Sequence, residues 1–313
     1  MTRSRSERKK MKKWMKITIG IFLTFFIVVS GYIAYTLFQV NKTLSTMHEP
    51  INREFSEKRP EKIDLKTREA ISIMLIGIDK QTGSTERGRS DSLIVLTVNP
   101  EDESMKMVSI PRDTRTELIG RGVQDKINHA HAFGGVEMSI PTVENFLNIP
   151  IDYYVKVNMQ GFKDIVDAVG GVEVNNKFAF TQDRINFAEG KLDLNGEEAL
   201  AFSRMRKQDP RGDFGRTDRQ KQIVQGIVNK GASFSGLTNL DSILGAIGNN
   251  VRTNLSTDEM LSIQRNYKEA RHDMETLQIS GSGTTINGIY YFSVPQEERL
   301  RISNTLRDHL NIN

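Results

Sequence analysis

The chain has 313 residues, no cysteine and a formal net charge of +4 at pH 7. Without cysteine it cannot form a disulfide scaffold, a thiolate zinc site or a cysteine nucleophile. Eight Lys/Arg and one Glu give residues 1–16 a net charge of +7, which leaves −3 for the rest, and a basic tail on a mildly acidic body argues against nucleic-acid binding.

An apolar run follows the basic tail. Residues 17–38 contain no charged side chain and are long enough to cross a hydrocarbon core of ~30 Å as a helix. The cationic residues before the run predict a cytoplasmic tail at residues 1–16 and an extracellular body. A cleaved signal peptide is the alternative, but its apolar core would be ~7–15 residues long. The longer run, with Tyr32, Tyr35 and Phe38 at its outer end, favours an uncleaved transmembrane signal anchor.

The region after the anchor divides into a stalk and a folded domain. Residues 39–70 are polar, contain Pro50 and Pro60 and have few apolar side chains, which is typical of an extracytoplasmic stalk. The folded domain is predicted at residues 71–313. It opens with three short β-branched runs, at residues 71–78, 93–98 and 105–110, each bounded by turn residues as expected of a buried strand.

Charged residues gather where these three strands begin and end. Asp79 follows the first run, Arg89 and Asp91 precede the second, and Arg112 follows the third. Open α/β sheets bind their ligands at the ends of strands. Two carboxylates beside two arginines are unusual in a core and typical of a site for a metal-bound phosphate.

The rest of the body alternates strand and helix patterns. Residues 153–157 and 172–174 have strand patterns and enclose an amphipathic helix at 159–169, so the β–α–β order predicts an α/β sheet covered by helices. Pro141 predicts a break, or a helix start, within the helical pattern of residues 136–147. Further helices are predicted at residues 195–202, 216–230, 242–249, 257–270 and 296–310, and further strands at 276–279 and 289–294.

Two histidines, His129 and His131, stand two residues apart. Such a pair can bind a metal, but the sequence offers no obvious third ligand nearby. Hydrogen-bonded structural histidines are the commoner explanation of such a pair. We therefore favour a structural role for both.

A second cluster of charged residues lies between residues 202 and 220. In an extended segment Arg204 and Arg206 point the same way, whereas on a helix they diverge by about 200°. Arg216, Arg219 and Gln220 share a helical face close to a predicted helix start, and a helix N-terminus with guanidinium groups around it is a strong anion site. A surface network of Arg–Asp ion pairs explains the same residues equally well, and the cluster alone does not decide between the two.

Taken together, these motifs resemble the LytR–CpsA–Psr family and, within it, the teichoic acid transferases. The resemblance covers essentially the whole body and rests on the order and spacing of the motifs, none of which is specific alone. The motifs are Gly77-Ile78-Asp79, Gly88–Ser92, Ser109–Asp113, Lys126–Ala130 with Gly134-Gly135, Ala199–Arg206, Arg216 and Arg219-Gln220.

The resemblance implies an α/β/α sandwich with a central mixed sheet. It implies that this fold moves an anionic wall polymer, in this branch wall teichoic acid, from undecaprenyl diphosphate to the C6 hydroxyl of N-acetylmuramic acid in peptidoglycan. Asp79 and Asp91 would hold Mg²⁺ on the diphosphate, which agrees with the preference of Mg²⁺ for one or two carboxylates plus phosphate oxygens and waters. The diphosphate-binding residues that the resemblance implies are Arg89, Arg112, Arg204, Arg206, Arg216 and Gln220.

The resemblance does not settle which group takes the proton of the sugar hydroxyl. Asp91, with Arg89, is the first catalytic candidate, although a carboxylate bound to Mg²⁺ is a weak base; Asp213 is the second. Phosphoryl transfer depends mainly on positioning and on charge neutralisation. The donor's prenyl chain needs a long apolar groove, whose residues cannot be told from core residues by sequence.

Two other functions are left open by the sequence. One is a lipid-diphosphate pyrophosphatase, in which water replaces the sugar, and the other is a non-enzymatic regulator of the cell envelope. DNA binding is disfavoured because the cytoplasmic tail is too short to fold. The predicted location is the cell membrane of a Gram-positive type of envelope, as a single-pass type II protein with its catalytic domain outside. The sequence does not specify the polymer carried, self-association or redundancy with paralogues.

Overall fold

The computed structural model describes residues 46–79, 87–232, 248 and 250–312, together with scattered positions between residues 14 and 38. No helix within these residues has the length and apolar character needed to cross a membrane. The predicted signal anchor at residues 17–38 lies only partly inside the described residues. The helix predicted at residues 242–249 lies almost entirely outside them.

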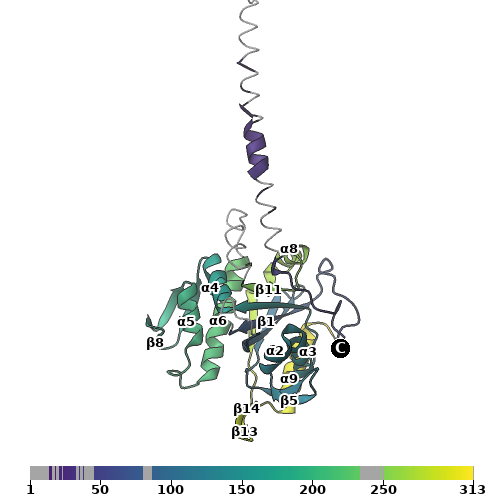
Figure 1. The fold of residues 1–313 in the computed structure, drawn as a ribbon, viewed down its shortest axis with the longest axis vertical. Coiled ribbons are helices and arrows are strands. Elements are labelled where there is room, and N and C mark those ends of the chain that lie inside the picture. The colour runs from purple at the N-terminus through teal and green to yellow at the C-terminus, as the bar shows by residue number, and fades with distance from the viewer. Residues whose placement is uncertain are drawn as a thin grey trace, which may run out of the picture.

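A six-stranded sheet forms the centre of the body (Figure 1). Its strands are β1 (Ile71–Ile78), β2 (Ser90–Asn99), β3 (Ser104–Ser109), β6 (Tyr153–Asn158), β11 (Val251–Thr253) and β12 (Asp273–Leu277). Their order across the sheet is β11-β6-β1-β2-β3-β12. β1 runs parallel to β6, and β3 to β12, whereas the other neighbours are antiparallel. The predicted α/β class with a central mixed sheet is therefore confirmed.

Alternation along β1 gives the sheet two different faces. Met74 and Ile76 are fully buried against one helical layer, whereas Ile73 and Leu75 lie partly buried on the opposite face. The first layer consists of α2 (His129–Gly134), α3 (Val136–Leu147) and α9 (Gln296–His309). The second, on the other side of the sheet in Figure 1, contains α4 (Met159–Ala168), α5 (Gly196–Arg204) and α6 (Asp213–Ala232). Beyond β11 the chain forms α8 (Thr257–Asn266) and the 3-10 helix η2 (Lys268–His272).

Four two-stranded sheets extend the body. They pair β4 (Arg115–Leu118) with β5 (Val123–Lys126), β7 (Val172–Asn176) with β10 (Gly190–Leu194), β8 (Phe180–Gln182) with β9 (Ile185–Phe187), and β13 (Ser282–Ile286) with β14 (Ile289–Ser293). A second hydrophobic core lies under α5. There the centroid of the Phe180 ring lies 4.9 Å from that of Phe187 and 5.6 Å from that of Phe202. This core fixes the end of α5, which carries part of the second charged cluster.

The break predicted at Pro141 was wrong, because α3 runs unbroken from Val136 to Leu147 with Pro141 inside it. A proline in a helix removes one backbone hydrogen bond, here the one to the Glu137 carbonyl. The buried face of the helix, Ile140, Val143 and Phe146 among others, packs in the main core and offsets that loss.

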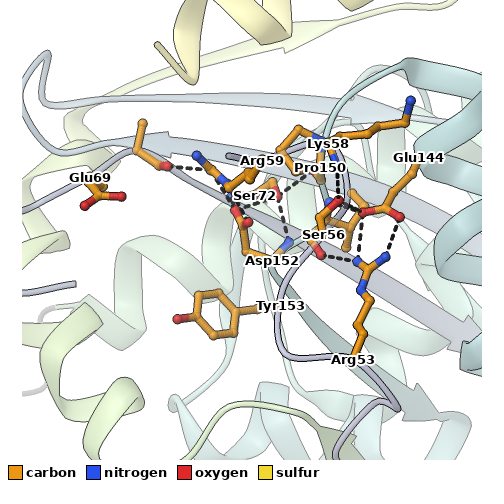
Figure 2. A network of polar contacts seen from close by, with 12 residues as sticks. Arg53, Ser56, Lys58, Arg59, Glu69, Ser72, Glu144, Pro150, Asp152 and Tyr153 are labelled. Carbon is orange, nitrogen blue, oxygen red and sulfur yellow. Dashed lines mark hydrogen bonds and ion pairs between the residues drawn. The ribbon is translucent and has the colours of Figure 1, made fainter. Parts of the chain in front are cut away.

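Residues 46–70, within the region predicted as a stalk, pack against the body (Figure 2). The Arg59 guanidinium donates to both Asp152 oxygens, at 2.7 and 2.9 Å, and both side chains are less than a tenth exposed. The Arg53 guanidinium likewise donates two hydrogen bonds to the Glu144 carboxylate, at 2.6 and 2.8 Å. Asp152 also accepts the backbone N–H of Ser72 at 2.8 Å. The segment is thereby tied to the start of β1, the strand whose other end leads into the charged cluster.

Candidate active site

An irregularity in the pairing of β1 with β2 determines the position of Asp91. Gly77 pairs with Ser92, and the next residue, Ile78, pairs with Ser90, so Asp91 is the extra residue of a β-bulge. Bulges reorient side chains and are common beside functional sites. A Cβ atom on Gly77 would lie 3.1 Å from the Ser92 Cβ, so the close approach of the two strands favours glycine here.

Asp79 lies at the same end of the sheet, directly after β1. Its backbone N–H donates to the Arg89 carbonyl oxygen at 3.2 Å, which joins the segment after β1 to the segment before β2. Asp79 and Asp91 both line two cavities, one polar and one apolar. The two predicted carboxylates therefore stand where these cavities meet.

The larger cavity, which we call the polar basin, has a volume of about 960 Å³. The wall of the basin includes the strand ends and α2. On α2 the exposed Phe133 ring stacks against the Arg121 guanidinium, whose carbon lies 3.9 Å from the ring centroid. Its lining residues are Asp79, Arg87, Gly88, Arg89, Asp91, Arg112, Asp113, Lys126, Asn128, His129, Ala132 and Phe133. The basin is open, charged and suited to polar ligands.

The smaller cavity, which we call the apolar groove, has a volume of about 420 Å³ and lies between the sheet and helices α4, α5 and α6. Its apolar side chains include Leu75, Ile94, Leu96, Val155, Val157, Phe162, Ile165, Leu200, Val224, Ile227 and Val228. Arg204, Arg216 and Gln220 are among its polar residues. A hydrophobic cavity that ends at carboxylates and guanidinium groups suits a lipid with an anionic head.

Arg112 forms an ion pair with Asp91, and its Nη1 donates to Oδ1 at 2.7 Å. Burial lowers the pKa of Arg112, but the hydrogen bond and charge of Asp91, together with Asp213 and Asp113, outweigh burial and raise the pKa above its ordinary value. The guanidinium is therefore a permanent positive charge at the boundary between the basin and the groove.

The first turns of α6 face the groove. Gln220 accepts the Ser92 hydroxyl at 3.1 Å, which ties α6 to β2. Arg216 is mostly buried and pairs with Asp213 at 2.9 Å, yet among the described residues its Nε has no hydrogen-bond partner. Burial lowers the pKa of Arg216, an effect that Asp213 opposes and Arg112 reinforces. A buried guanidinium with an unused donor, next to a second one, favours the binding of an anion.

Arg219, which shares a predicted face with Arg216, has a different environment. It is buried, donates to Asp209 Oδ2 at 2.8 Å and to the Met205 carbonyl at 2.6 Å, and lies over the Phe180 ring. Arg211 pairs with Asp209 and Asp218 nearby. The Arg–Asp network that the sequence left open therefore exists around Arg219 and Arg211, which line neither cavity, whereas the groove arginines Arg204 and Arg216 each pair with one aspartate.

Arg204 and Arg206 flank Met205, which is fully buried. Arg204 is the last residue of α5, and Met205 already has an extended backbone, with φ −60° and ψ 130°. Both arginine side chains are exposed, on the side away from Met205. Arg204 lines the groove and pairs with Asp183 at 3.5 Å, whereas Arg206 is not among the lining residues of either cavity.

Comparison with known proteins identifies this arrangement. The LytR_cpsA_psr family matches residues 34–308, which is most of the chain. This protein belongs to the LytR–CpsA–Psr family. A relative from Halalkalibacterium halodurans, named polyisoprenyl-teichoic acid–peptidoglycan teichoic acid transferase TagU, is 52% identical over 305 residues, covering 96% of this chain and 100% of the relative.

Solved structures of this family have the same fold. B. subtilis TagV is 42% identical, with a TM-score of 0.70 over 79% of this chain and 99% of that chain. The family member YwtF (TagT), solved with bound octaprenyl pyrophosphate lipid, is 28% identical, with a TM-score of 0.68 over 85% of this chain and 100% of that chain. The family resemblance found from the motifs is therefore confirmed.

The structure gathers most of the predicted site residues of this family member around the two carboxylates. Arg89 and Arg112 lie on the basin side, and Arg204, Arg216 and Gln220 on the groove side. An apolar groove for the prenyl chain was expected, but its residues could not be assigned from sequence, because its valines, leucines and isoleucines have the pattern of ordinary core residues. Sequence reasoning missed Lys126 and Phe133 in the basin wall, although both lie in or beside quoted motifs.

The two histidines of the motif differ in their surroundings. His131 is buried, its Nδ1 lies 3.0 Å from the Gly88 carbonyl oxygen, and burial lowers its pKa. It holds α2 against the start of β2, as a structural histidine does. His129 lines the basin, and its Nδ1 lies 2.8 Å from Asp125 Oδ2.

Proposed function

We propose that this protein is a phosphotransferase that moves an anionic wall polymer of the teichoic acid type from a polyprenyl diphosphate to peptidoglycan. The observation that carries the proposal is the meeting of an apolar groove and a polar basin at Asp79 and Asp91. A polyprenyl-diphosphate-linked glycopolymer has the same three parts: an apolar chain, a diphosphate and a polar polymer. The names of the relatives, which describe teichoic acid transferases and a bound octaprenyl pyrophosphate, support this assignment.

In this proposal the prenyl chain lies in the groove and the diphosphate at the junction. Arg204, Arg216 and Gln220 would bind it from the groove side, and Arg89 and Arg112 from the basin side. Arg206 lines neither cavity, but its positive charge acts on Arg216 and would add to the attraction for the diphosphate. Guanidinium groups suit this task because their planar fork can grip two phosphate oxygens at once.

The carboxylate pair fits a magnesium ion that is held jointly with the diphosphate. Asp79 is exposed, and the Asp91 side chain is 36% exposed with its Oδ1 bonded to Arg112. In the described part of the chain no group of three or more His, Asp or Glu residues could hold a metal. Two carboxylates leave the remaining ligand positions to phosphate oxygens and waters, as Mg²⁺ prefers. The ion would supply neutralisation of the negative charge on the phosphate oxygens.

The chain's own residues would act mainly by positioning. The groove fixes the leaving prenyl phosphate on one side of the reacting phosphorus, and the basin admits the acceptor hydroxyl, the C6 hydroxyl of N-acetylmuramic acid, on the other. Such a separation matches the in-line arrangement of attacking and leaving oxygens in phosphoryl transfer. Arg216 and Arg112 would stabilise the charge that develops on the departing phosphate.

A transfer assay tests the proposal. Purified protein in detergent is given a polyprenyl-diphosphate-linked polymer, Mg²⁺ and peptidoglycan fragments, and both products are measured. We expect the polymer–glycan phosphodiester and prenyl phosphate in equal amounts, with little prenyl phosphate when the glycan is left out. Equally fast release of prenyl phosphate without glycan would show a pyrophosphatase instead, and no turnover of any kind would favour the regulator.

The location is part of the proposal. A signal anchor at residues 17–38 with the basic tail inside would put the basin and the groove on the outer face of the membrane, where peptidoglycan is found. Protease added to intact protoplasts should remove the body and spare a small N-terminal fragment. Full protection of the body would contradict both the orientation and a function in the wall.

A further inference from the structure

The polar basin contains a histidine–carboxylate pair that the roles proposed above leave unused. His129 begins α2, Asp125 lies in β5, and the two are joined at 2.8 Å between Nδ1 and Oδ2. Both side chains are about one quarter exposed, and of the two it is His129 that lines the basin. A basin of about 960 Å³ lies directly against His129.

Asp125 is held in place and kept ionised. Its Oδ1 accepts the Lys126 backbone N–H at 2.8 Å and the Tyr291 hydroxyl at 3.4 Å. Burial by itself raises the pKa of Asp125, but the hydrogen bonds from His129 and Lys126 outweigh burial and lower the pKa below its ordinary value. An ionised carboxylate only accepts hydrogen bonds, so Nδ1 of His129 must be the donor. In the neutral ring the other nitrogen, Nε2, then has a free lone pair.

The ring of His129 is oriented from a second side by Phe133, whose ring meets it edge-on at 5.9 Å between centroids. Asn128, the residue before His129, donates its backbone N–H to the Arg112 carbonyl at 3.3 Å, which ties the start of α2 to the segment of the diphosphate-binding arginine. The charged groups that share the basin wall with His129 are Arg87, Arg89, Arg112, Lys126, Asp79, Asp91 and Asp113.

We propose that His129, oriented by Asp125, is the general base that takes the proton from the acceptor hydroxyl. This inference rests on the proposed transferase function and assigns the proton acceptor that the resemblance left open. Asp91 is a poorer base because its Oδ1 is engaged by Arg112 at 2.7 Å and because, in the proposed function, the same carboxylate would hold a magnesium ion. Asp213 is poorer still, since it pairs with the buried Arg216 and is not among the basin's lining residues. Histidine is the side chain most often used for this task near neutral pH.

The step balances as follows. The hydroxyl oxygen of the glycan forms a bond to the phosphorus that carries the polymer, and its proton passes to Nε2 of His129. The bond from that phosphorus to the bridging oxygen breaks, and its electron pair leaves with prenyl phosphate. The imidazolium then releases its proton to water in the open basin. The products are a polymer–glycan phosphodiester, prenyl phosphate and one proton.

The test is the pH dependence of transfer in a His129→Gln variant. In the wild-type protein we expect the turnover number to fall at acidic pH, because a general base must be unprotonated to accept the proton. In the variant the turnover number should no longer depend on pH in this way, and at pH 7.5 it should be lower by about 10²-fold or more. Binding of the lipid diphosphate should be unchanged. The matched control is His272→Gln, which removes an exposed histidine paired with Glu269 at 3.2 Å and should leave rate and profile unchanged.

Two further variants keep the test decisive. Asp125→Asn should also lower turnover, because an amide cannot fix the same tautomer. A His129→Ala variant should regain activity in added imidazole, in proportion to its neutral form, whereas a purely structural loss would not be rescued. The inference is overturned if folded His129→Gln protein transfers polymer at the wild-type rate with the wild-type pH profile. If the wild-type protein transfers nothing, the proposed function fails instead.

Discussion

Arg112 Nη1 donates a hydrogen bond of 2.7 Å to Asp91 Oδ1, and Asp91 lies at the boundary between the polar basin and the apolar groove. Each charge is therefore partly neutralised by the other. A diphosphate arriving at the junction would offer Arg112 new oxygen acceptors and would leave Asp91 free to bind a cation. In the proposed function the pair would therefore supply a ligand for the cation and a ligand for the diphosphate side by side.

The first prediction concerns the two carboxylates. Asp79→Asn and Asp91→Asn are nearly isosteric, so both variants should fold with unchanged melting temperature. Each loses one carboxylate ligand, and transfer should fall by roughly 10²–10³, because a metal ion at a reacting phosphate contributes several kcal/mol. The remaining activity should need a higher Mg²⁺ concentration, as measured by titration of the metal. Normal turnover of both variants in excess chelator would show that the site holds no metal.

The second prediction concerns the arginines at the end of α5. Arg204→Lys keeps the charge but loses the planar fork, and should cost about 1.5–3 kcal/mol, a ten- to hundredfold drop in kcat/KM. Arg206→Lys should cost less, because Arg206 lines neither cavity. Arg211→Lys is the control, because the Arg211 side chain is exposed, lines neither cavity and pairs with Asp209 and Asp218, so transfer should be unchanged. If Arg204→Lys matches this control, the end of α5 does not contact the diphosphate.

The third prediction separates Arg216 from Arg219, which are three residues apart on α6. Arg219→Met leaves the buried Asp209 carboxylate without its buried partner, with only the exposed Arg211 beside it, and should cost about 3–5 kcal/mol of unfolding free energy, measured with urea. Arg216→Lys should leave unfolding within about 1 kcal/mol and lower transfer instead. Equal losses of stability in the two variants would contradict the assignment of Arg216 to the ligand.

The Arg219–Asp209 pair also predicts a dependence of stability on pH. Burial raises the pKa of Asp209, but the hydrogen bond from Arg219 and its other partners outweigh burial and hold the pKa below its ordinary value. A carboxyl group with a depressed folded-state pKa contributes stability above its unfolded pKa, about 3.9, and loses it as pH falls through the folded value. Asp209→Asn should therefore be less stable than wild type at pH 7, and the difference should shrink below about pH 4.

Several parts of the site were predictable from sequence, for physical reasons. The β-branched runs before Asp79 and Arg112 predicted buried strands followed by charged residues. In the structure these charged residues lie together, at the same ends of the neighbouring strands. Arg216 and Arg219 could not be distinguished, because periodicity places both on one side of a helix. Their roles depend on whether Asp209 or the groove faces that side, which is decided by tertiary packing.

Two further features of the structure also depend on tertiary packing. Pro141 was expected to interrupt a helix, but local propensity was overridden by the buried side chains on either side of it. Residues 46–70 contain few apolar side chains, and two-pronged Arg–carboxylate pairs such as Arg59 with Asp152 attach them to the body. The pattern of apolar residues in the sequence does not predict such ion pairs.

The last prediction concerns the apolar groove, which distinguishes a lipid-linked donor from a soluble one. Val224, on α6, lines the groove together with Val155 and Leu96 from the sheet. A Val224→Trp substitution should fill part of the cavity without removing any charged residue of the site. A donor with a long prenyl chain then loses contacts worth roughly 0.8 kcal/mol for each displaced CH₂ group, so its kcat/KM should fall more than tenfold. A donor with two isoprene units needs less of the groove and should react at close to the wild-type rate.

Leu261→Trp is the control for this substitution, because Leu261 is an exposed residue of α8 outside the groove and should accept tryptophan without effect on either donor. The measurement is the ratio of kcat/KM for the long-chain and short-chain donors in each protein, with the melting temperature as a check of folding. An unchanged ratio in folded Val224→Trp protein would show that the prenyl chain binds elsewhere. A ratio that falls only in this variant would identify the cavity between the sheet and α6 as the site of the lipid.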